Sequence, residues 1–209
     1  IEFLQRKELY FILNLQGGGN MKKNKIEIVW FGRGGMGVKT AALLFGEAFV
    51  HKGKFVQAFP EYGPERRGAP LFAFTRISEY GIKGHYGIKD PDIIVVIDPM
   101  LLKTESFKSF IKNNTVLLIN TGVNPEDLKK SLNLKSEIKT VDATGISKKI
   151  FGREMPNAPL LGALLKIIGL LTLEEFLIFV KERLMNKYDE RIVEKNIEAI
   201  KLAYKEVKG

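Results

Sequence analysis

The feature that most restricts the fold of this chain is a short apolar run that ends in clustered glycines, IVWFGRGGMGVKT at 28–40. The apolar half predicts a buried strand, and the segment after the glycines predicts a helix, Val38–Val50, with one apolar face. Gly32, Gly34 and Gly37 fit the spacing G-x-G-x-x-G between the two, where a backbone without side chains can turn sharply and approach an anion. The segment therefore predicts an α/β sheet with a functional turn at the carboxyl end of its first strand.

The rest of the chain alternates short apolar runs with amphipathic segments. Apolar runs bounded by turn residues predict strands at Ile26–Phe31, Phe55–Phe59, Leu71–Ile77, Asp92–Ile97, Thr115–Ile119 and Ile138–Val141. The last third predicts three helices: Pro156–Leu171, a second from the capping box Thr172–Glu175 to about Asn186, and a third that carries Val193, Ile197, Ile200, Tyr204 and Val207 on one face. This alternation predicts a single three-layer, Rossmann-like α/β domain with a mostly parallel sheet and helices on both faces.

The first twenty residues differ from the rest. Their apolar stretch is short and broken by charges, so it fits neither a membrane-spanning helix nor a signal peptide. Met21 follows and leads through a lysine-rich stretch into the first strand. We interpret 1–20 as a non-native or flexible N-terminal extension and 21–209 as the domain. The alternative is an arm that docks on a partner, and mass spectrometry of the native N-terminus distinguishes the two.

Composition excludes several kinds of site. The chain has 209 residues, a net charge of +9, no cysteine and only two histidines, His51 and His85. Without cysteine it cannot hold a disulfide, a thiolate zinc site or a cysteine-ligated iron–sulfur cluster, and the two distant histidines argue against a histidine metal site or a catalytic triad. The lysines are dispersed without an aromatic-interleaved basic stripe, so we expect no nucleic acid partner and no membrane partner. The lack of cysteine is consistent with a cytoplasmic location.

Two nucleotide sites that use such glycines do not fit this sequence. An NAD or FAD site needs an acid at the end of the second strand to hold the ribose, and Lys52–Pro60 contains none. A P-loop needs a lysine where Val38 stands, and Lys39 comes one residue late, turned by about 100° on a helix. The turn therefore either packs tightly or approaches the phosphates of a shared coenzyme or a partner subunit. Its candidate cofactor-binding residues are Gly32, Arg33, Gly34, Gly35 and Gly37.

A second unusual segment, residues 59–70, combines prolines and glycines that fix its backbone with two carboxylates and an arginine pair. Arginines can grip carboxylates or phosphates in a bidentate manner, while internal Glu–Arg pairs would hold the loop itself, and both uses are compatible. Because the segment follows the second strand, we expect it near the glycine turn. Arg66 and Arg67 are the candidate cofactor-binding residues, and the candidate partner interface is Glu61, Tyr62, Glu65, Arg66 and Arg67.

Four segments together resemble the gamma subunit of the 2-oxoacid:ferredoxin oxidoreductases. They are GRGGMGVKTAA at 32–42, FPEYGPERRGAPLFAFTRIS at 59–78, DPDIIVVIDPMLL at 90–102 and NAPLLGALLK at 157–166, in this order. The ERRGAP form within the second segment resembles the pyruvate branch or the branched-chain 2-oxoacid branch of the family. Met36 departs from the pattern, because many relatives have glutamine there.

The resemblance implies a complex that decarboxylates a 2-oxoacid on thiamine diphosphate with Mg²⁺. It passes electrons through iron–sulfur clusters to ferredoxin and transfers the acyl group to coenzyme A, or runs in reverse as a synthase. The alpha and beta chains would hold the thiamine cofactor and a delta chain the clusters, so the gamma chain would bind no cofactor alone and carry no catalytic residue. Pyruvate is the expected substrate, and 2-oxoisovalerate is the alternative.

The resemblance also suggests a role for the two unusual loops. The glycine turn and the arginine-containing segment at 59–70 would form a surface that contacts the phosphates of coenzyme A or fixes the subunit interface. A rival hypothesis is a stand-alone Rossmann-type nucleotide-binding protein, which predicts that the isolated chain binds NAD, FAD or ATP.

Overall fold

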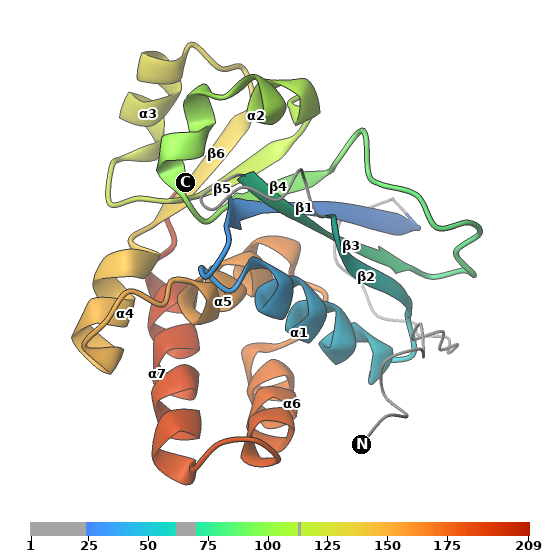
Figure 1. Cartoon of the computed structure of the whole chain (residues 1–209), viewed down its shortest axis with the longest axis vertical. Helices are drawn as coiled ribbons and strands as arrows, with labels where there is room; N and C mark the ends of the chain where they lie inside the picture. The colour runs from blue at the N-terminus through green and yellow to red at the C-terminus, as the bar shows by residue number, and fades with distance from the viewer. Residues whose placement is uncertain (1–23, 62–69, 113) are drawn as a thin grey trace.

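A computed structural model gives the fold and describes residues 24–61, 70–112 and 114–209. The proposed N-terminal extension, 1–20, lies outside these residues. Within them, the strands form one sheet in the order β2-β3-β1-β4-β5-β6 (Figure 1). Its strands are β1 Lys25–Arg33, β2 Phe55–Glu61, β3 Pro70–Ser78, β4 Ile93–Val96, β5 Val116–Asn120 and β6 Glu137–Val141.

The sheet is mostly parallel, as predicted, but its neighbour order is not that of a doubly wound sheet. Strands β1, β4, β5 and β6 run parallel, whereas β3 lies between β1 and β2 and is antiparallel to both. The length of the connection explains why β2 and β3 are antiparallel. Only eight residues, 62–69, separate β2 from β3, and a parallel crossover needs a dozen or more. Strand β2, which follows α1, lies two positions from β1, with β3 between them.

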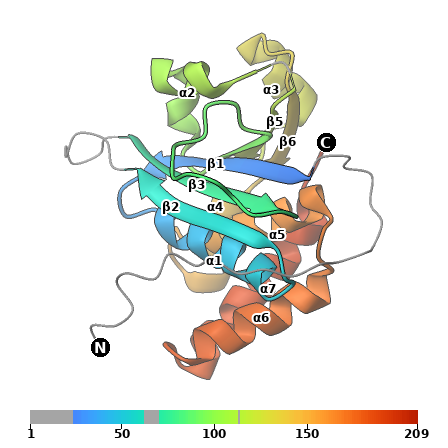
Figure 2. The ribbon, with the colours of Figure 1, turned by 90° about the vertical axis from the view of Figure 1, so that its right-hand side faces the viewer.

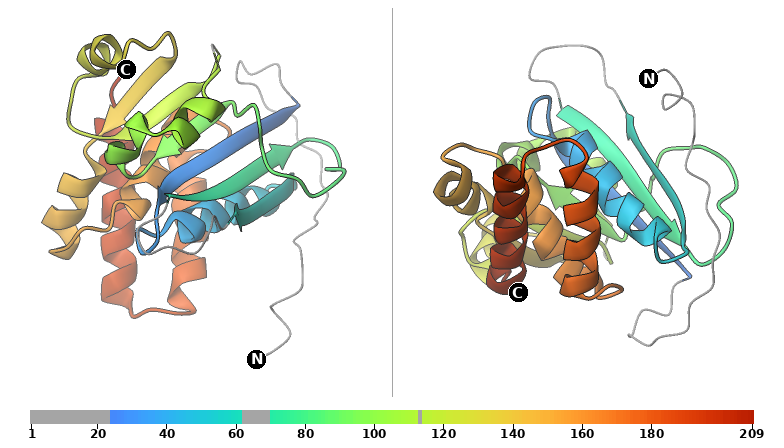
Figure 3. Two further views of the ribbon diagram at one scale, coloured as in Figure 1. Left: turned by 45° about the horizontal axis from the view of Figure 1, so that its top comes forward. Right: turned by 90° about the horizontal axis from the view of Figure 1, so that it is seen from below.

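Helices cover both faces of the sheet, which confirms the predicted three layers (Figures 2 and 3). One face carries α1 Val38–Val50, α4 Ala143–Phe151, α5 Asn157–Ile168, α6 Leu173–Met185 and α7 Glu190–Glu206. The other carries η2 Pro99–Lys103, α2 Glu105–Phe110 and α3 Pro125–Leu132. Each face has its own apolar core, one around the buried Trp30 and Phe45, the other around Phe31, Phe74 and Phe107.

Four short helices were not predicted: η2, α2, α3 and α4. Each begins at a side chain that caps its first N–H groups, namely Asp98, Thr104, Asn124 and Asp142. Such caps stabilise segments too short to show helical periodicity. None of the helices in the described ranges is long and apolar enough to cross a membrane.

Two contacts fix the helices that reach the glycine turn. The Trp30 indole Nε1 donates to the Thr75 hydroxyl at 2.9 Å, and that hydroxyl donates to the Ala42 carbonyl at 2.9 Å, so α1 is tied to β1 and β3. On α5, a Cβ added to Gly162 would lie 2.1 Å from the Ile200 carbonyl oxygen, which shows how closely α5 and α7 approach. These contacts fix α1 against the sheet and α5 against α7.

Candidate functional site at the carboxyl edge of the sheet

The glycine turn is shorter than predicted, because β1 continues through Arg33. Gly32 therefore lies in the strand and not in the turn. It is buried, and an added Cβ would lie 2.8 Å from Val38 Cγ2 and 3.2 Å from Ile97 Cβ. The lack of a side chain at Gly32 lets α1 and the residue after β4 pack closely against β1, and its assignment as a cofactor-binding residue stays a prediction.

Gly34 and Gly35 form the exposed part of the turn. Both are exposed, and an added Cβ at either position would meet no atom of the described residues within 4 Å. Gly35 has a φ of +88°, a conformation that favours glycine. This part of the turn presents bare backbone that a ligand or another chain can approach.

Gly37 joins the turn to two helices. It precedes α1 with a φ of +76°, and no side chain caps the helix there. A Cβ added to Gly37 would lie 2.7 Å from the Nδ2 atom of Asn157, the first residue of α5. Because Pro156 gives α5 no side-chain cap either, two helix N-termini with their positive dipole ends converge at this turn. The sequence analysis did not select Asn157 as a site residue, although it lies in the fourth family motif.

Arg33, a predicted cofactor-binding residue, forms an ion pair within the chain. Its guanidinium Nε lies 2.5 Å from the Oδ2 atom of Asp98, which follows β4. The other carboxylate oxygen of Asp98 accepts a hydrogen bond from the Met100 N–H at 3.0 Å, at the start of η2. The charge of Arg33 is therefore partly compensated within the chain, and Asp98 is a residue of this edge that sequence reasoning missed.

The buried side-chain amide of Asn120, at the end of β5, holds the neighbouring strand ends in place. The Asn120 Nδ2 atom donates to the Ile97 carbonyl at 2.9 Å and to the Thr144 hydroxyl at 2.8 Å, while Asn120 Oδ1 accepts from the Thr144 N–H at 3.0 Å. These bonds join the ends of β4 and β5 to the start of α4. The carboxyl edge beside the glycine turn is therefore fixed by hydrogen bonds rather than left as loose loops.

The arginine segment attaches to this same edge. Residues 62–69, which include Tyr62, Glu65, Arg66 and Arg67, lie outside the described residues. Their flanking residues are described: Pro70 pairs with Arg33 across β3 and β1, and the exposed Glu61 ends β2 opposite Phe72. Both attachment points thus lie at the carboxyl edge, as the sequence analysis expected.

The second strand does have a terminal acid, contrary to the prediction, because β2 runs two residues further than predicted and ends at Glu61. The strand order disfavours a dinucleotide site instead. Since β3 occupies the position beside β1, Glu61 stands two strands from the glycine turn, roughly 10 Å across the sheet. In a dinucleotide site the ribose-binding acid ends the strand next to the glycine strand.

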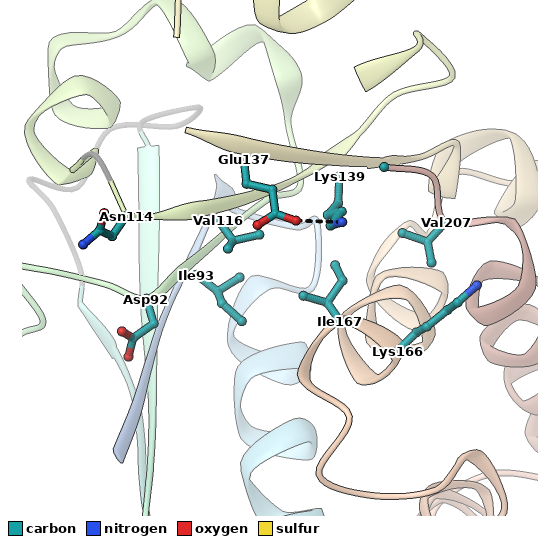
Figure 4. Close-up of a pocket in the computed structure, with 10 residues that line it drawn as sticks. Asp92, Ile93, Asn114, Val116, Glu137, Lys139, Lys166, Ile167 and Val207 are labelled. Atoms are coloured by element: carbon teal, nitrogen blue, oxygen red, sulfur yellow. Dashed lines mark ion pairs between the residues drawn. The ribbon is translucent and has the colours of Figure 1, made fainter. Parts of the chain in front are cut away.

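A cavity of about 510 Å³ opens at the opposite edge of the sheet, where the parallel strands begin (Figure 4). Its charged side chains already have partners: Glu137 pairs with Lys139 at 2.7 Å, Asp92 accepts the Glu27 N–H at 2.9 Å, and the Lys166 ammonium lies 5.9 Å from the centre of the Tyr204 ring. In open α/β sheets, ligands bind at the carboxyl ends of the strands. We therefore place the candidate site at the glycine turn.

Within residues 24–61, 70–112 and 114–209, no group of three or more His, Cys, Asp or Glu side chains could hold a metal ion. The chemistry of the carboxyl edge is instead that of exposed glycine backbone, two helix N-termini and a paired arginine. Such an edge can bind an anionic group or the surface of another chain.

The sequence matches the model of the family described as pyruvate ferredoxin/flavodoxin oxidoreductase over residues 27–206. It is 38% identical to the pyruvate synthase subunit PorC of Thermotoga maritima, over 89% of this chain and 96% of that one. It is 40% identical to the pyruvate/ketoisovalerate oxidoreductases common subunit gamma of Thermococcus kodakarensis, over 86% of this chain and 95% of that one.

Solved structures agree with this result. The crystal structure of pyruvate oxidoreductase subunit PORC from Thermotoga maritima superposes with a TM-score of 0.75 at 36% identity, covering 89% of this chain and 98% of that one. The 2-oxoglutarate:ferredoxin oxidoreductase of Magnetococcus marinus shares the fold, with a TM-score of 0.70 at 17% identity, over 88% of this chain and 32% of that longer one. The match thus covers nearly the full length of the separate gamma-type chains, as the four motifs predicted, and the chain belongs to the pyruvate ferredoxin/flavodoxin oxidoreductase family.

Proposed function

We propose that this chain is the gamma subunit of a cytoplasmic, multi-subunit pyruvate:ferredoxin oxidoreductase. The complex would convert pyruvate and coenzyme A to acetyl-CoA and CO₂ while reducing ferredoxin, or run the reverse synthase reaction. The observation that carries the proposal is the 38–40% identity over at least 95% of the length of relatives named as subunits of such enzymes. The chain has no cysteine to hold an iron–sulfur cluster, so we propose that it is inactive alone.

Its proposed partners are the alpha and beta subunits, which would hold thiamine diphosphate and Mg²⁺, and a delta subunit with iron–sulfur clusters that passes electrons to ferredoxin. A pull-down with this chain as bait should recover thiamine-dependent and iron–sulfur subunits. The rival function, a stand-alone nucleotide-binding protein, predicts micromolar binding of NAD, FAD or ATP by the purified chain, and that result would contradict the subunit proposal.

A second candidate substrate is 2-oxoisovalerate. The relative from Thermococcus kodakarensis is named as a subunit common to the pyruvate and ketoisovalerate oxidoreductases. One gamma chain of this kind can therefore serve two enzymes in that organism. Assay of the native complex with both 2-oxoacids decides between a shared chain and a pyruvate-specific one.

For the carboxyl edge we propose contact with the phosphates of coenzyme A or with a partner subunit. The exposed backbone at Gly34 and Gly35 and the two uncapped helix N-termini suit an anionic group, because unpaired N–H groups and helix dipoles favour negative charge. Arg66 and Arg67 would add positive charge from the adjoining segment. A protein of the same fold, from Magnetococcus marinus, was solved with coenzyme A bound.

Two Gly34 variants with side chains of nearly equal size distinguish contact with the phosphates of coenzyme A from contact with a partner subunit. Gly34 has open space around it, so Gly34→Gln and Gly34→Glu should both fold. If the turn contacts a phosphate, the glutamate should raise the KM for coenzyme A about tenfold more than the glutamine, because like charges repel, and added salt should reduce the difference.

If the turn instead meets a partner subunit, both Gly34 variants should weaken assembly to a similar extent and leave the KM for coenzyme A unchanged. The same assays on Arg66→Ala and Arg67→Ala test the adjoining segment. A complex that keeps both its assembly and its KM for coenzyme A with all four variants contradicts both roles.

A further inference from the structure

A groove lies between α1 and α6, beside the glycine turn, and the function proposed above leaves it unused. Figure 3 shows the two helices side by side below the sheet. The groove encloses about 180 Å³. Its lining residues are Lys39, Thr40, Leu43, Leu44 and Glu47 from α1, with Arg183, Leu184, Lys187 and Tyr188 from the end of α6 and the turn after it.

The two helices that form the groove are held together by ion pairs. The Arg183 guanidinium donates to both carboxylate oxygens of Glu47, with Nε and Nη2 at 2.6 and 3.4 Å from them. Lys52, two residues after the end of α1, pairs with Glu175 in the first turn of α6. The two helices therefore run in opposite directions. The groove therefore has fixed walls, and its far end adjoins Lys39, two residues after the glycine turn.

The lining of the groove is apolar with a positive rim. Leu43, Leu44 and Leu184 are half-buried, and the Tyr188 side chain is 49% exposed. Glu47 forms an ion pair with Arg183. Lys39 and Lys187 are exposed, and neither forms an ion pair with any residue of the described ranges. The groove thus offers an apolar lining with two lysines that form no ion pair among the described residues.

The size of the groove indicates what kind of occupant it can take. Pockets for small-molecule ligands usually enclose 300–1,000 Å³, and this groove falls below that range. It instead suits a single large apolar side chain, the kind of buried anchor that dominates the binding energy of protein interfaces. The two lysines favour carboxylates beside that anchor, because complementary charges steer association and select the partner.

We propose that this groove docks a segment of another subunit of the oxidoreductase, one that carries an apolar anchor side chain flanked by carboxylates. This inference rests on the proposed function, since it assigns part of the subunit interface. It also gives a role to Lys39 and Thr40, which follow the glycines without completing a P-loop. Both residues line the groove, so its lining begins two residues after Gly37 in the chain.

Charge reversal tests the groove in the assembled complex. The double variant Lys39→Glu/Lys187→Glu should bind the remaining subunits roughly tenfold more weakly, and Tyr188→Ala should also weaken binding. The matched control is Lys130→Glu/Lys201→Glu, because both lysines are exposed, lie on α3 and α7, and form no ion pair within the described part of the chain. It changes the net charge equally and should shift affinity less than about twofold. Equal losses for the two double variants would overturn the proposal.

Because the chain has no cysteine, a single introduced thiol identifies the occupant. Thr40→Cys labelled with a maleimide–benzophenone should cross-link to a peptide of another subunit that contains an apolar residue beside Asp or Glu. The control Ser131→Cys, on the opposite face of the sheet, should not capture that peptide. Cross-linking to a second copy of this chain, to a peptide without acidic residues, or to nothing would overturn the docking assignment.

These experiments distinguish a failure of the groove proposal from a failure of the proposed function. If wild-type chain does not bind the other subunits at all, the proposed function fails and the groove proposal fails with it. If wild-type chain assembles and the groove variant assembles as well as its control, only the groove proposal fails. Wild-type affinity, measured first, therefore tells the two apart.

Discussion

The guanidinium of Arg33 and the carboxylate of Asp98 lie 2.5 Å apart and join the ends of β1 and β4 at the carboxyl edge of the sheet. Arg33 belongs to the glycine motif, and Asp98 belongs to a motif far along the chain. The same aspartate caps η2 through the Met100 N–H. Two segments that the sequence presents separately are thus one structural unit beside the candidate site.

Asp98→Ala should destabilise the fold by about 1–3 kcal/mol, because it removes both a charge-assisted hydrogen bond and a helix cap. Asp98→Asn keeps a good capping residue and should lose only part of that amount. Denaturant unfolding of both variants, at unchanged m-value, measures whether Asp98→Ala loses more stability than Asp98→Asn. Wild-type stability in both would show that the pair contributes nothing to the fold.

Gly37→Ala should destabilise the chain more than Gly152→Ala. Both glycines have nearly the same φ, +76° and +74°, so both substitutions carry the cost of a left-handed conformation, about 1 kcal/mol or more. Only at Gly37 would the new Cβ also meet Asn157, at 2.7 Å, whereas Gly152 has nothing within 4 Å. The difference in unfolding free energy measures the contact between the starts of α1 and α5, and equal losses would show that Asn157 moves aside freely.

Gly162→Ala should cost about 3 kcal/mol even though alanine is the better helix former by about 1 kcal/mol. The new Cβ would lie 2.1 Å from the backbone oxygen of Ile200, so α5 and α7 must separate. Thermal unfolding measures the loss. A gain in melting temperature, as helix propensity alone predicts, would contradict the close approach of these helices.

Glu175 should make stability depend on pH in the acidic range. Hydrogen bonding to Lys52, together with the bonds of the Thr172 capping box, lowers the pKa of the Glu175 carboxyl from 4.5 to about 2. Because the folded-state pKa is lower than the unfolded one, the ionised carboxylate stabilises the fold above about pH 4.5, and this contribution is lost as the pH falls towards 2.

The measurement is the melting temperature of wild type against Glu175→Gln from pH 7 to pH 2. Glutamine can still accept the N–H bond of the capping box but cannot pair with Lys52. The wild-type advantage should be constant near neutral pH and shrink below about pH 4.5. Glu174→Gln, in the same helical turn, is the control and should not reproduce this profile.

The strongest signals in the sequence predicted the fold well. The bounds of α1 agree with the predicted Val38–Val50, because the apolar stripe is long and the glycines before it mark its start. The capping box of α6 is confirmed with both of its hydrogen bonds, from Thr172 and from Glu175. Such features depend on residues close together in the chain, so the sequence alone carries them.

What the sequence analysis missed depends on distant residues or on short elements. The helices α2, α3 and α4 have six to nine residues, too few for a clear period, and they depend on caps and on buried anchors such as Phe107. Asp98 and Asn157 belong to motifs far along the chain from the glycines, and only the fold brings them to the glycine turn. The antiparallel pairing of β2 with β3 was open to prediction, since so short a connection cannot hold a parallel crossover, whereas the place of β3 beside β1 was not.

The most direct test of the central claim is reconstitution of the enzyme from its separate subunits with and without this chain. We measure pyruvate- and coenzyme A-dependent reduction of ferredoxin. We expect no activity for the chain alone, little or none for the remaining subunits without it, and recovery when it is added at equal amounts. Turnover by the isolated chain, or full activity of the other subunits in its absence, would show that this chain is not a required subunit.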